Sequence, residues 1–376
     1  MMNAKMNIQN NSYLLVDLAA VRENARFIIK ELGPGTELIP VLKDDAYGLG
    51  LVPVARALCA LSEIRVLAVA HVSEGLALRE AGIDREVLVM GGALPFQMEA
   101  AVGADLTLAC GHAGFLTEAA KAAAGLQKQA RVQIKIDTGL HRIGFDLSEL
   151  DALCAEIRAC GDLVRIEGVF SHFSDVSDPE LNEKEFALFL RAVDFLERAG
   201  VEIPKRHMTC SASSECWPQY NLDAARCGRR LYMDRPGVQR GEIREAASWR
   251  AYITQVKRRK KGERLGYGGV VTLERDSLIA TVGVGYGDGL NQALFSVGAP
   301  VLVGGERCRM LVCCMDQCMV DVTGLHVGVG DEVTFFGYDA AGNFLSSQEV
   351  SALVNKNEGC GLTSALSPRV ARIYTE

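Results

Sequence analysis

Five polar residues with acid–base or covalent potential lie at or just beyond the ends of apolar segments. They are Lys43, Lys135, His172, Ser211 and Arg226. A lysine that ends a core strand is costly to desolvate unless it has a charged partner or a chemical role. Lys43 ends such a segment and is followed by an Asp- and Gly-rich turn. Lys43 is therefore the first candidate for a reactive group.

The segments that carry these residues alternate with amphipathic or Ala-rich stretches that are typical of helices. Eight strand–helix repeats over this length favour an α/β fold, a (β/α)₈ TIM-type barrel, and a doubly wound sheet is the alternative. Chemistry gathers at the carboxyl ends of barrel strands, so these residues are expected to face one mouth. The expected strands are 38–43, 65–70, 86–90, 106–109, 132–137, 166–170, 207–210 and 224–228.

The alternation of predicted strands and helices ends near residue 244. Short strands separated by Gly-rich turns follow, with no long helix between them, which predicts a mostly β C-terminal domain. A polar leader or linker opens the chain. The expected domains are therefore residues 1–12 (leader), 13–243 (barrel) and 244–376 (β-rich domain).

Composition limits the classes of function. The 376 residues are 49% hydrophobic and carry a net charge of −7, so nucleic acid is not an expected partner. The 12 cysteines lie mostly in apolar runs without a CxxC pair, which favours reduced core thiols in a cytoplasmic protein without a bound metal. No segment has the length and apolarity of a membrane span.

The strand-end residues suit an aldehyde cofactor that carries a phosphate. Lys43 would form the covalent link, and Ser211 with Gly-flanked backbone N–H groups would hold the phosphate. Arg226 could face the ring nitrogen. Because an arginine does not readily release a proton, the ring nitrogen would stay unprotonated and a deprotonated substrate would be reprotonated quickly.

Three segments of the β-rich domain also stand out. Tyr267 lies among glycines in the turn 264–269, where its side chain can project into a neighbouring site. The other two segments are Gly285-Tyr286-Gly287-Asp288-Gly289 and Cys314-Met315-Asp316-Gln317.

Together these motifs resemble the alanine racemase family of pyridoxal 5'-phosphate (PLP) enzymes, which have a barrel and a C-terminal β domain. The resemblance extends from Leu14 to Tyr374. The motifs that carry it are Lys43-Asp-Asp-Ala-Tyr-Gly-Leu-Gly50, Lys135-Ile-Asp-Thr-Gly-Leu-His-Arg-Ile-Gly-Phe145, Gly285–Gly289, Met315-Asp316-Gln317 and Leu366-Ser-Pro-Arg-Val370.

The resemblance implies a two-base racemase in which Lys43 acts on the D face and Tyr267 on the L face of the substrate. In the family the tyrosine comes from the partner subunit, which implies a homodimer with shared active sites. Lys135 matches a lysine that many members carry as a carbamate. The cofactor contacts implied are Lys43, Tyr47, His172, Ser211, Arg226 and Gly228, and the substrate contacts are Arg142 and Met315.

One departure from the family bears on the substrate. Asn357 stands where the family usually has a tyrosine beside the phosphate and the substrate side chain. A smaller residue that can donate and accept would suit a hydroxymethyl group, and a site that binds a hydroxyl discriminates against its absence. This favours L-serine racemisation, with L-alanine also accepted.

Other departures are Gln292 and Val312 in place of family arginines, Cys227 in place of the usual proline after Arg226, and Arg229 in place of an apolar residue near the phosphate. The pattern of departures is similar to that of the serine/alanine racemases of vancomycin-resistance clusters. Those enzymes supply D-amino acids for cell-wall precursors and carry a membrane domain ahead of a cytoplasmic racemase domain. By this resemblance, a full-length parent would be membrane-anchored. An ordinary alanine racemase is the alternative. Two further alternatives are a fold-related PLP amino-acid decarboxylase, disfavoured by the Tyr267 and Met315 motifs, and a non-catalytic cofactor-binding barrel, disfavoured by the second domain.

Overall fold

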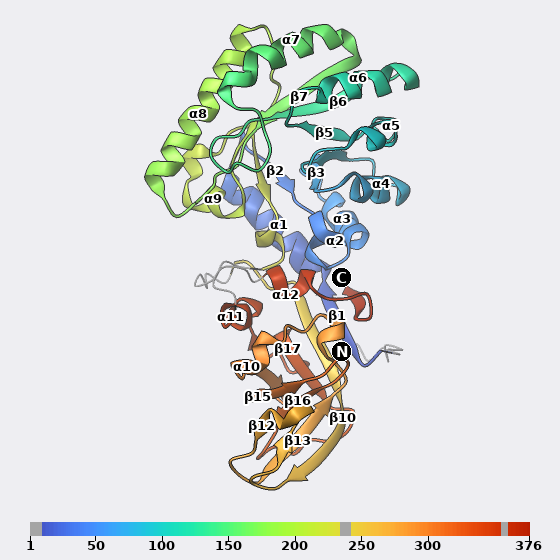
Figure 1. Ribbon diagram of the computed structural model, residues 1–376, viewed down its shortest axis with the longest axis vertical. Coiled ribbons are helices and arrows are strands. Elements are labelled where there is room, and N and C mark those ends of the chain that lie inside the picture. Colours follow the sequence, from blue (N-terminus) through green and yellow to red (C-terminus); the bar gives the residue numbers. More distant parts are fainter. Residues whose placement is uncertain (1–9, 234–241, 355–359) are drawn as a thin grey trace. The chain divides into compact units, whose positions relative to one another are not determined.

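The chain folds into two units, each built on its own strands (Figure 1). The computed structural model describes residues 10–233, 242–354 and 360–376. One unit comprises residues 21–46 and 51–231. The other takes the residues up to 20, residues 47–50 and those from 232 onward, so the chain passes between the units more than once.

The first unit is a closed ring of parallel strands. Six strands pair in the order β3-β4-β5-β6-β7-β8, and β2 pairs with β9. Bridges between Val41 and Ala68 and between Cys210 and Arg226 join the two groups. Closure confirms the (β/α)₈ barrel and excludes a doubly wound sheet. The strands are β2 (Glu37–Pro40), β3 (Val66–Val69), β4 (Glu86–Val89), β5 (Thr107–Cys110), β6 (Ala130–Lys135), β7 (Val164–Phe170), β8 (Arg206–His207) and β9 (Ala224–Cys227).

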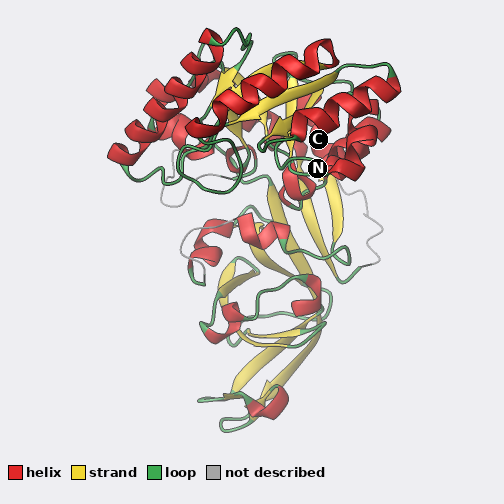
Figure 2. Ribbon diagram, turned by 45° about the horizontal axis from the view of Figure 1, so that its top comes forward, coloured by secondary structure: helices red, strands yellow, loops and turns green. Residues whose placement is uncertain are grey.

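Helices cover the outside of this barrel (Figures 1 and 2). The longest, α8, begins where the sequence supplies its own start signals. The Asp178 carboxylate accepts a hydrogen bond from the Leu181 N–H at 3.0 Å, and Pro179 occupies the first turn. From Leu18 to Cys216 the helical segments are α1 (Leu18–Leu32), α2 (Lys43–Tyr47, a left-handed turn after its first residue), α3 (Leu51–Cys59), α4 (Val72–Glu80), α5 (Met98–Gly103), α6 (Phe115–Leu126), α7 (Leu150–Cys160), α8 (Pro179–Arg198) and α9 (Ser211–Cys216); α2 and α9 follow strand ends instead of covering the outside.

The second unit is a nine-stranded sheet in the order β18-β17-β14-β15-β16-β13-β10-β1-β19. An additional pairing of β17 with β10 curls the sheet on itself. Trp249 packs against Phe335 and Phe336 in its core. The strands are β1 (Ser12–Asp17), β10 (Ala247–Arg259), β13 (Ser277–Val282), β14 (Pro300–Val303), β15 (Glu306–Cys313), β16 (Cys318–Asp321), β17 (Glu332–Tyr338), β18 (Phe344–Leu345) and β19 (Ala371–Thr375).

Shorter elements complete this unit. A small hairpin of β11 (Arg264–Leu265) and β12 (Val271–Thr272) pairs outside the large sheet. The helices are α10 (Ala293–Ser296), α11 (Ser347–Ala352) and α12 (Cys360–Ser364). The fold is thus a barrel followed by a mostly β domain, as the sequence predicts.

One expected domain boundary differs from the structure. The sequence-based division assigned residues 13–20 to the barrel, but β1 belongs to the β-rich unit. It pairs antiparallel with β10 and parallel with β19, and those hydrogen bonds place it in that sheet.

Candidate active site

Lys43 lies just past a barrel strand and not within it. Strand β2 ends at Pro40, and the Leu42 N–H still donates to the Ala68 carbonyl at 2.7 Å. Lys43 then begins α2, so the expected strand 38–43 is too long. The four residues after Lys43 have φ between 54° and 58°, in the left-handed region. Each such non-glycine residue costs about 1–2 kcal/mol.

Two carboxylates hold this left-handed turn. Glu74, on α4, accepts hydrogen bonds from the backbone N–H groups of Asp44 at 2.5 Å and His71 at 3.0 Å. Asp45 accepts from the Leu51 N–H at 2.7 Å. A strained backbone persists only where surrounding contacts hold it in place. Glu74 and Asp45 therefore fix the backbone conformation of the turn that begins at Lys43, whose side chain is exposed. Glu74 was not predicted from the sequence, because the residue three positions before it is His71 and not the Ser or Thr of a capping box.

Lys135, at the end of β6, is a buried amine. Its Nζ donates to the Ile136 carbonyl at 2.6 Å and lies 3.5 Å from the Ser171 hydroxyl. Its side chain is 3% exposed. Burial, and then the nearby charge of Arg226, lower the pKa of Lys135 from 10.5 to about 7. At neutral pH a large share of this amine is therefore unprotonated and nucleophilic.

The loop after β6 presents Arg142. The Asp137 carboxylate accepts from the N–H groups of Gly139 at 3.0 Å and His141 at 3.1 Å. Gly144 has φ +128°, and a Cβ there would lie 2.6 Å from the Asp137 nitrogen, so only glycine fits. These contacts fold the loop back on β6 and leave Arg142 exposed.

Arg226, on β9, is 4% exposed and has an extensive set of acceptors. One terminal nitrogen (Nη1) donates to His207 Nδ1 at 2.5 Å and to the His207 carbonyl at 3.3 Å. The other (Nη2) donates to the carbonyls of Ser171 at 2.6 Å and Met208 at 3.1 Å. It also approaches His172 Nδ1 at 3.2 Å.

The contacts of Arg226 determine the protonation of His172 and leave one guanidinium donor unused. An arginine has five N–H donors and no acceptor, so Nδ1 of His172 must be unprotonated and its proton sits on Nε2. Burial, and then the charge of Arg226, lower the pKa of His172 to about 3, so the ring is neutral. Within the described residues, the Nε–H of Arg226 is the guanidinium donor that makes no hydrogen bond.

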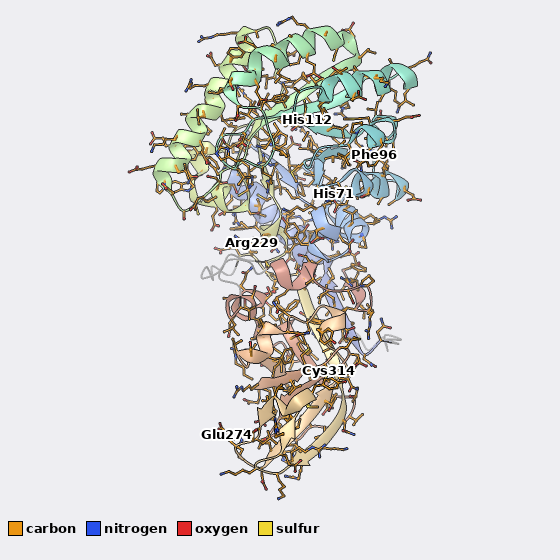
Figure 3. All side chains as sticks on the ribbon, in the orientation of Figure 1. His71, Phe96, His112, Arg229, Glu274 and Cys314 are labelled. Carbon is orange, nitrogen blue, oxygen red and sulfur yellow. The ribbon has the colours of Figure 1, made fainter. Side chains whose placement is uncertain are left out.

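Ser211 and Gly228 come together from different strands. The Gly228 N–H donates to the Ser211 hydroxyl oxygen at 3.0 Å, and both residues are buried. The hydroxyl keeps its own proton for another acceptor. Arg229, labelled in Figure 3, follows directly, and its Nε is buried without a hydrogen-bond partner. The four predicted barrel residues Lys135, His172, Ser211 and Arg226 thus all occupy carboxyl ends of the barrel strands.

Three separate motifs of the β-rich unit form one cluster. The N–H groups of Tyr286 and Gly287 donate to the carbonyls of Cys314 (labelled in Figure 3) at 3.0 Å and Met315 at 2.8 Å. The close approach requires glycine, because a Cβ at 285 would lie 2.4 Å from the Cys314 oxygen. Asp288 pairs with Arg369 at 3.2 Å, which draws in the C-terminal motif. Met315 emerges 57% exposed.

Two tyrosines of this unit lie differently. Tyr267 stands on the tight turn η6 (Tyr267–Gly269) and is 85% exposed. The Arg264 guanidinium braces the turn by donating to the carbonyls of Gly268 at 2.6 Å and Gly269 at 3.1 Å. Tyr47 packs its ring against Tyr232, with centroids 5.2 Å apart. Asn357 lies outside the described residues.

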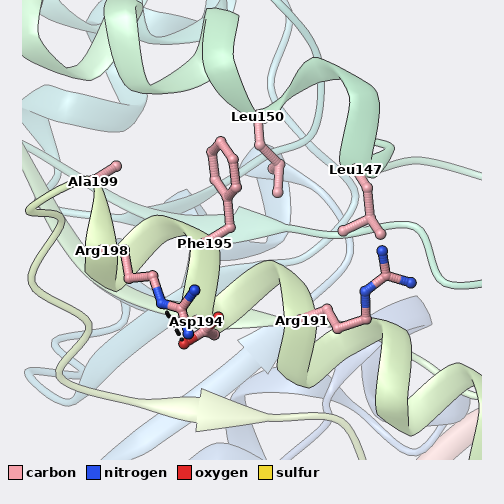
Figure 4. Close-up of a pocket in the computed structure, with 7 residues that line it drawn as sticks. All are labelled: Leu147, Leu150, Arg191, Asp194, Phe195, Arg198 and Ala199. Atoms are coloured by element: carbon pink, nitrogen blue, oxygen red, sulfur yellow. Dashed lines mark ion pairs between the residues drawn. The ribbon is translucent and has the colours of Figure 1, made fainter.

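A depression of about 640 Å³ on the barrel unit does not belong to this group (Figure 4). It lies between α7 and α8 on the outer, helical side, where Arg198 pairs with Asp194 at 3.0 Å. Its lining residues are Leu147, Leu150, Arg191, Asp194, Phe195, Arg198 and Ala199. None of the predicted site residues lines it.

A closed barrel with a strand-end lysine, a buried arginine and a serine–glycine pair, joined to a β-rich domain, defines the class of barrel-type PLP enzymes. The alanine racemase N-terminal domain family matches residues 16–236, and the alanine racemase C-terminal domain family matches residues 246–374. The chain therefore belongs to the alanine racemase family and is a PLP-dependent amino-acid racemase, an isomerase.

Relatives and solved structures agree with this. An alanine racemase of Desulforamulus reducens is 35% identical to this chain, and the match covers 96% of this chain and 97% of the relative. An alanine racemase of Methanococcus maripaludis is 32% identical to this chain, and the match covers 96% of this chain and 97% of the relative. The alanine racemase structure from Streptomyces lavendulae has TM-score 0.91 at 28% identity, covering 98% of both chains. The alanine racemase structure from Bacillus anthracis with bound L-Ala-P has a TM-score of 0.90 at 28% identity, and the match covers 98% of this chain and 96% of that chain.

Across the described part of the chain, the helices are all too short or too polar to cross a membrane.

Proposed function

We propose that this enzyme interconverts L- and D-alanine. The observation that carries the proposal is the full-length match to proteins named alanine racemase, including a solved structure with L-Ala-P bound. Neither the relatives nor the solved structures favour the serine preference expected from Asn357 or the vancomycin-resistance role expected from the pattern of departures from the family. The ordinary alanine racemase, which was the alternative in the sequence analysis, is the better-supported substrate assignment.

The residues at the barrel mouth fit PLP. Lys43 would hold the aldehyde carbon. The Ser211 hydroxyl would bind the phosphate with the proton that it keeps, and the Gly228 N–H would position that hydroxyl beside the phosphate. Tyr47 and His172 would contact the cofactor. Bound PLP would supply the electron withdrawal that acidifies the substrate Cα–H.

Arg226 would face the ring nitrogen with its remaining donor. Its two terminal nitrogens already bond to carbonyls and imidazoles, which leaves the Nε–H directed away from those acceptors. Burial lowers the pKa of Arg226 only to about 10, so it stays protonated at neutral pH. It donates a hydrogen bond and no proton, which keeps the ring nitrogen unprotonated and favours reprotonation of the substrate over side reactions.

Two groups would exchange protons with opposite faces of Cα. Lys43 would act on the D face and Tyr267 on the L face, each alternating as acid and base. Tyr267 is 85% exposed on its own unit, which supports its use by the active site of a partner subunit. Met315, also exposed, would line the same shared site of a homodimer.

Arg142 would bind the substrate carboxylate. Lys135 would carry a carbamate, because its pKa of about 7 leaves a neutral amine that can react with carbon dioxide. The product would be an anion among the positive charges that lower this pKa, Arg226 and Arg142. A carbamate is thus electrostatically favoured where a protonated amine is not.

The test is racemisation of L-alanine and L-serine measured side by side on one preparation. We expect a higher kcat/KM for alanine, and Lys43→Ala should remove both the visible absorbance of bound PLP and the activity. A higher kcat/KM for serine would return the serine hypothesis to first place. Carbon dioxide release from either amino acid would indicate the decarboxylase alternative, and absorbance that survives in Lys43→Ala would refute the cofactor assignment.

A further inference from the structure

A buried hydrogen-bonded chain runs across the barrel behind Arg226. The side-chain oxygen of Gln133, on β6, lies 2.7 Å from His207 Nε2, and His207 Nδ1, on β8, lies 2.5 Å from Arg226 Nη1. Gln133 is 1% exposed and His207 is 0% exposed. Water therefore does not compete for these bonds.

The position of one proton follows from the chemistry of the partners. Arginine only donates, so His207 Nδ1 must accept and carry no proton. A neutral imidazole then has its proton on Nε2, which needs an acceptor. The Gln133 amide oxygen is that acceptor. Burial lowers the pKa of His207 well below its ordinary value, which agrees with a neutral ring.

We propose that Gln133 is a positioning residue for the reaction. By accepting the Nε2–H of His207, it holds His207 in the tautomer whose Nδ1 accepts from Arg226, and so holds the guanidinium in register for the cofactor. The inference rests on the role proposed above for Arg226.

The other tautomer would be incompatible with this arrangement. A proton on Nδ1 would oppose the Nη1–H of Arg226, and Nη1 would keep only the His207 carbonyl at 3.3 Å. A buried donor without a partner is costly, so the guanidinium would shift. Phe170 does not decide the tautomer: it stacks on the His207 ring at 9° and 5.1 Å and lies 5.2 Å below Arg226. It fixes the planes of these groups, whereas Gln133 fixes the proton.

The test compares Gln133→Met, which keeps side-chain length but removes the acceptor, with Gln133→Glu, which keeps an acceptor. Thr107→Val is the matched control, because Thr107 is also a buried polar barrel residue, whose hydroxyl bonds to Glu86 at 3.2 Å and not to His207. Each protein is studied as the PLP-loaded enzyme labelled with ¹⁵N-histidine, and six histidines give few ring signals to assign.

We expect the Nε2–H tautomer of His207 in the wild type, Gln133→Glu and Thr107→Val, and loss of that single tautomer in Gln133→Met. In Gln133→Met the visible absorbance of bound PLP should shift and kcat should fall roughly tenfold or more, with KM for alanine changing less than kcat. Gln133→Glu should restore most of both.

Several results would overturn the inference. An Nδ1–H tautomer in the wild type refutes it even if no variant folds. An unchanged tautomer in Gln133→Met also refutes it. A changed tautomer with unchanged absorbance and kcat refutes the link from His207 to Arg226. Failure of the proposed function would look different: the wild type would lack PLP absorbance or racemisation while the histidine spectrum still reported the tautomer.

Discussion

Replacing Lys135 by methionine should stabilise the protein, and the gain should depend on pH. The amine has a pKa of 10.5 when unfolded and about 7 when folded, because burial and Arg226 disfavour its charged form. Each pKa unit corresponds to roughly 1.4 kcal/mol, so the protonated amine costs roughly 4–5 kcal/mol in the folded state. Methionine has a similar length and no charge to desolvate.

The sign follows from proton binding. Below pH 7 both states bind the proton and the full cost is present. Between the two pKa values the unfolded state binds more protons, so the free energy of unfolding of the wild type rises with pH. By about pH 9 the wild type should have recovered roughly 2 kcal/mol relative to Lys135→Met.

Urea unfolding of the cofactor-free protein in carbon dioxide-depleted buffer, at one protein concentration, measures this difference. Allowing for the lost bond to the Ile136 carbonyl, Lys135→Met should exceed the wild type by roughly 2–4 kcal/mol at neutral pH. Lys128→Met is the control, because Lys128 is an exposed lysine that also bonds to a backbone carbonyl. A stability gap that does not narrow with pH, or a less stable Lys135→Met at every pH, would refute the reasoning.

Three further outcomes are expected. Tyr267→Phe should reduce α-proton exchange of L-alanine far more than that of D-alanine, measured by deuterium washout; equal losses would contradict the two-base assignment. Asn357→Tyr should lower the serine-to-alanine ratio of kcat/KM, and an unchanged ratio rejects Asn357 as a selector. Burial raises the pKa of Glu245 from 4.5 to about 7, so the wild type should lose roughly 3 kcal/mol as pH rises between these values. In urea titrations, the free energy of unfolding of Glu245→Gln should not fall over this pH range. An equal fall in the variant would show that Glu245 is not the group responsible.

The barrel was predictable because its strands are short apolar segments between helices. The expected strand 86–90 differs from β4 (Glu86–Val89) by one residue. The sheet to which β1 belongs was not predictable in the same way. A lone apolar strand does not reveal its partners, and β10 and β19 lie far along the chain.

The types of residue in the site were predictable, but their supports were not. The left-handed turn after Lys43 depends on a carboxylate from the next strand–helix repeat, Glu74, and no local pattern at 43–47 announces it. The bond between Gln133 and His207 depends on which inward-facing side chains share a level of the barrel. That is set by the relative offset of strands β6 and β8, which sequence periodicity does not give.

The charges at the barrel mouth oppose the composition of the whole chain. The protein has a net charge of −7, yet the groups that lower the pKa of His172 after burial are all basic side chains: Arg226, Arg142, Lys135 and Lys43. Closely placed cations repel one another in a partly desolvated site, so an anion bound there relieves a cost already present in the folded protein. A cofactor phosphate, a substrate carboxylate and a carbamate on Lys135 are each such an anion. The local field therefore favours the anionic cofactor and the substrate carboxylate, although the net charge of −7 alone predicts repulsion of both anionic groups.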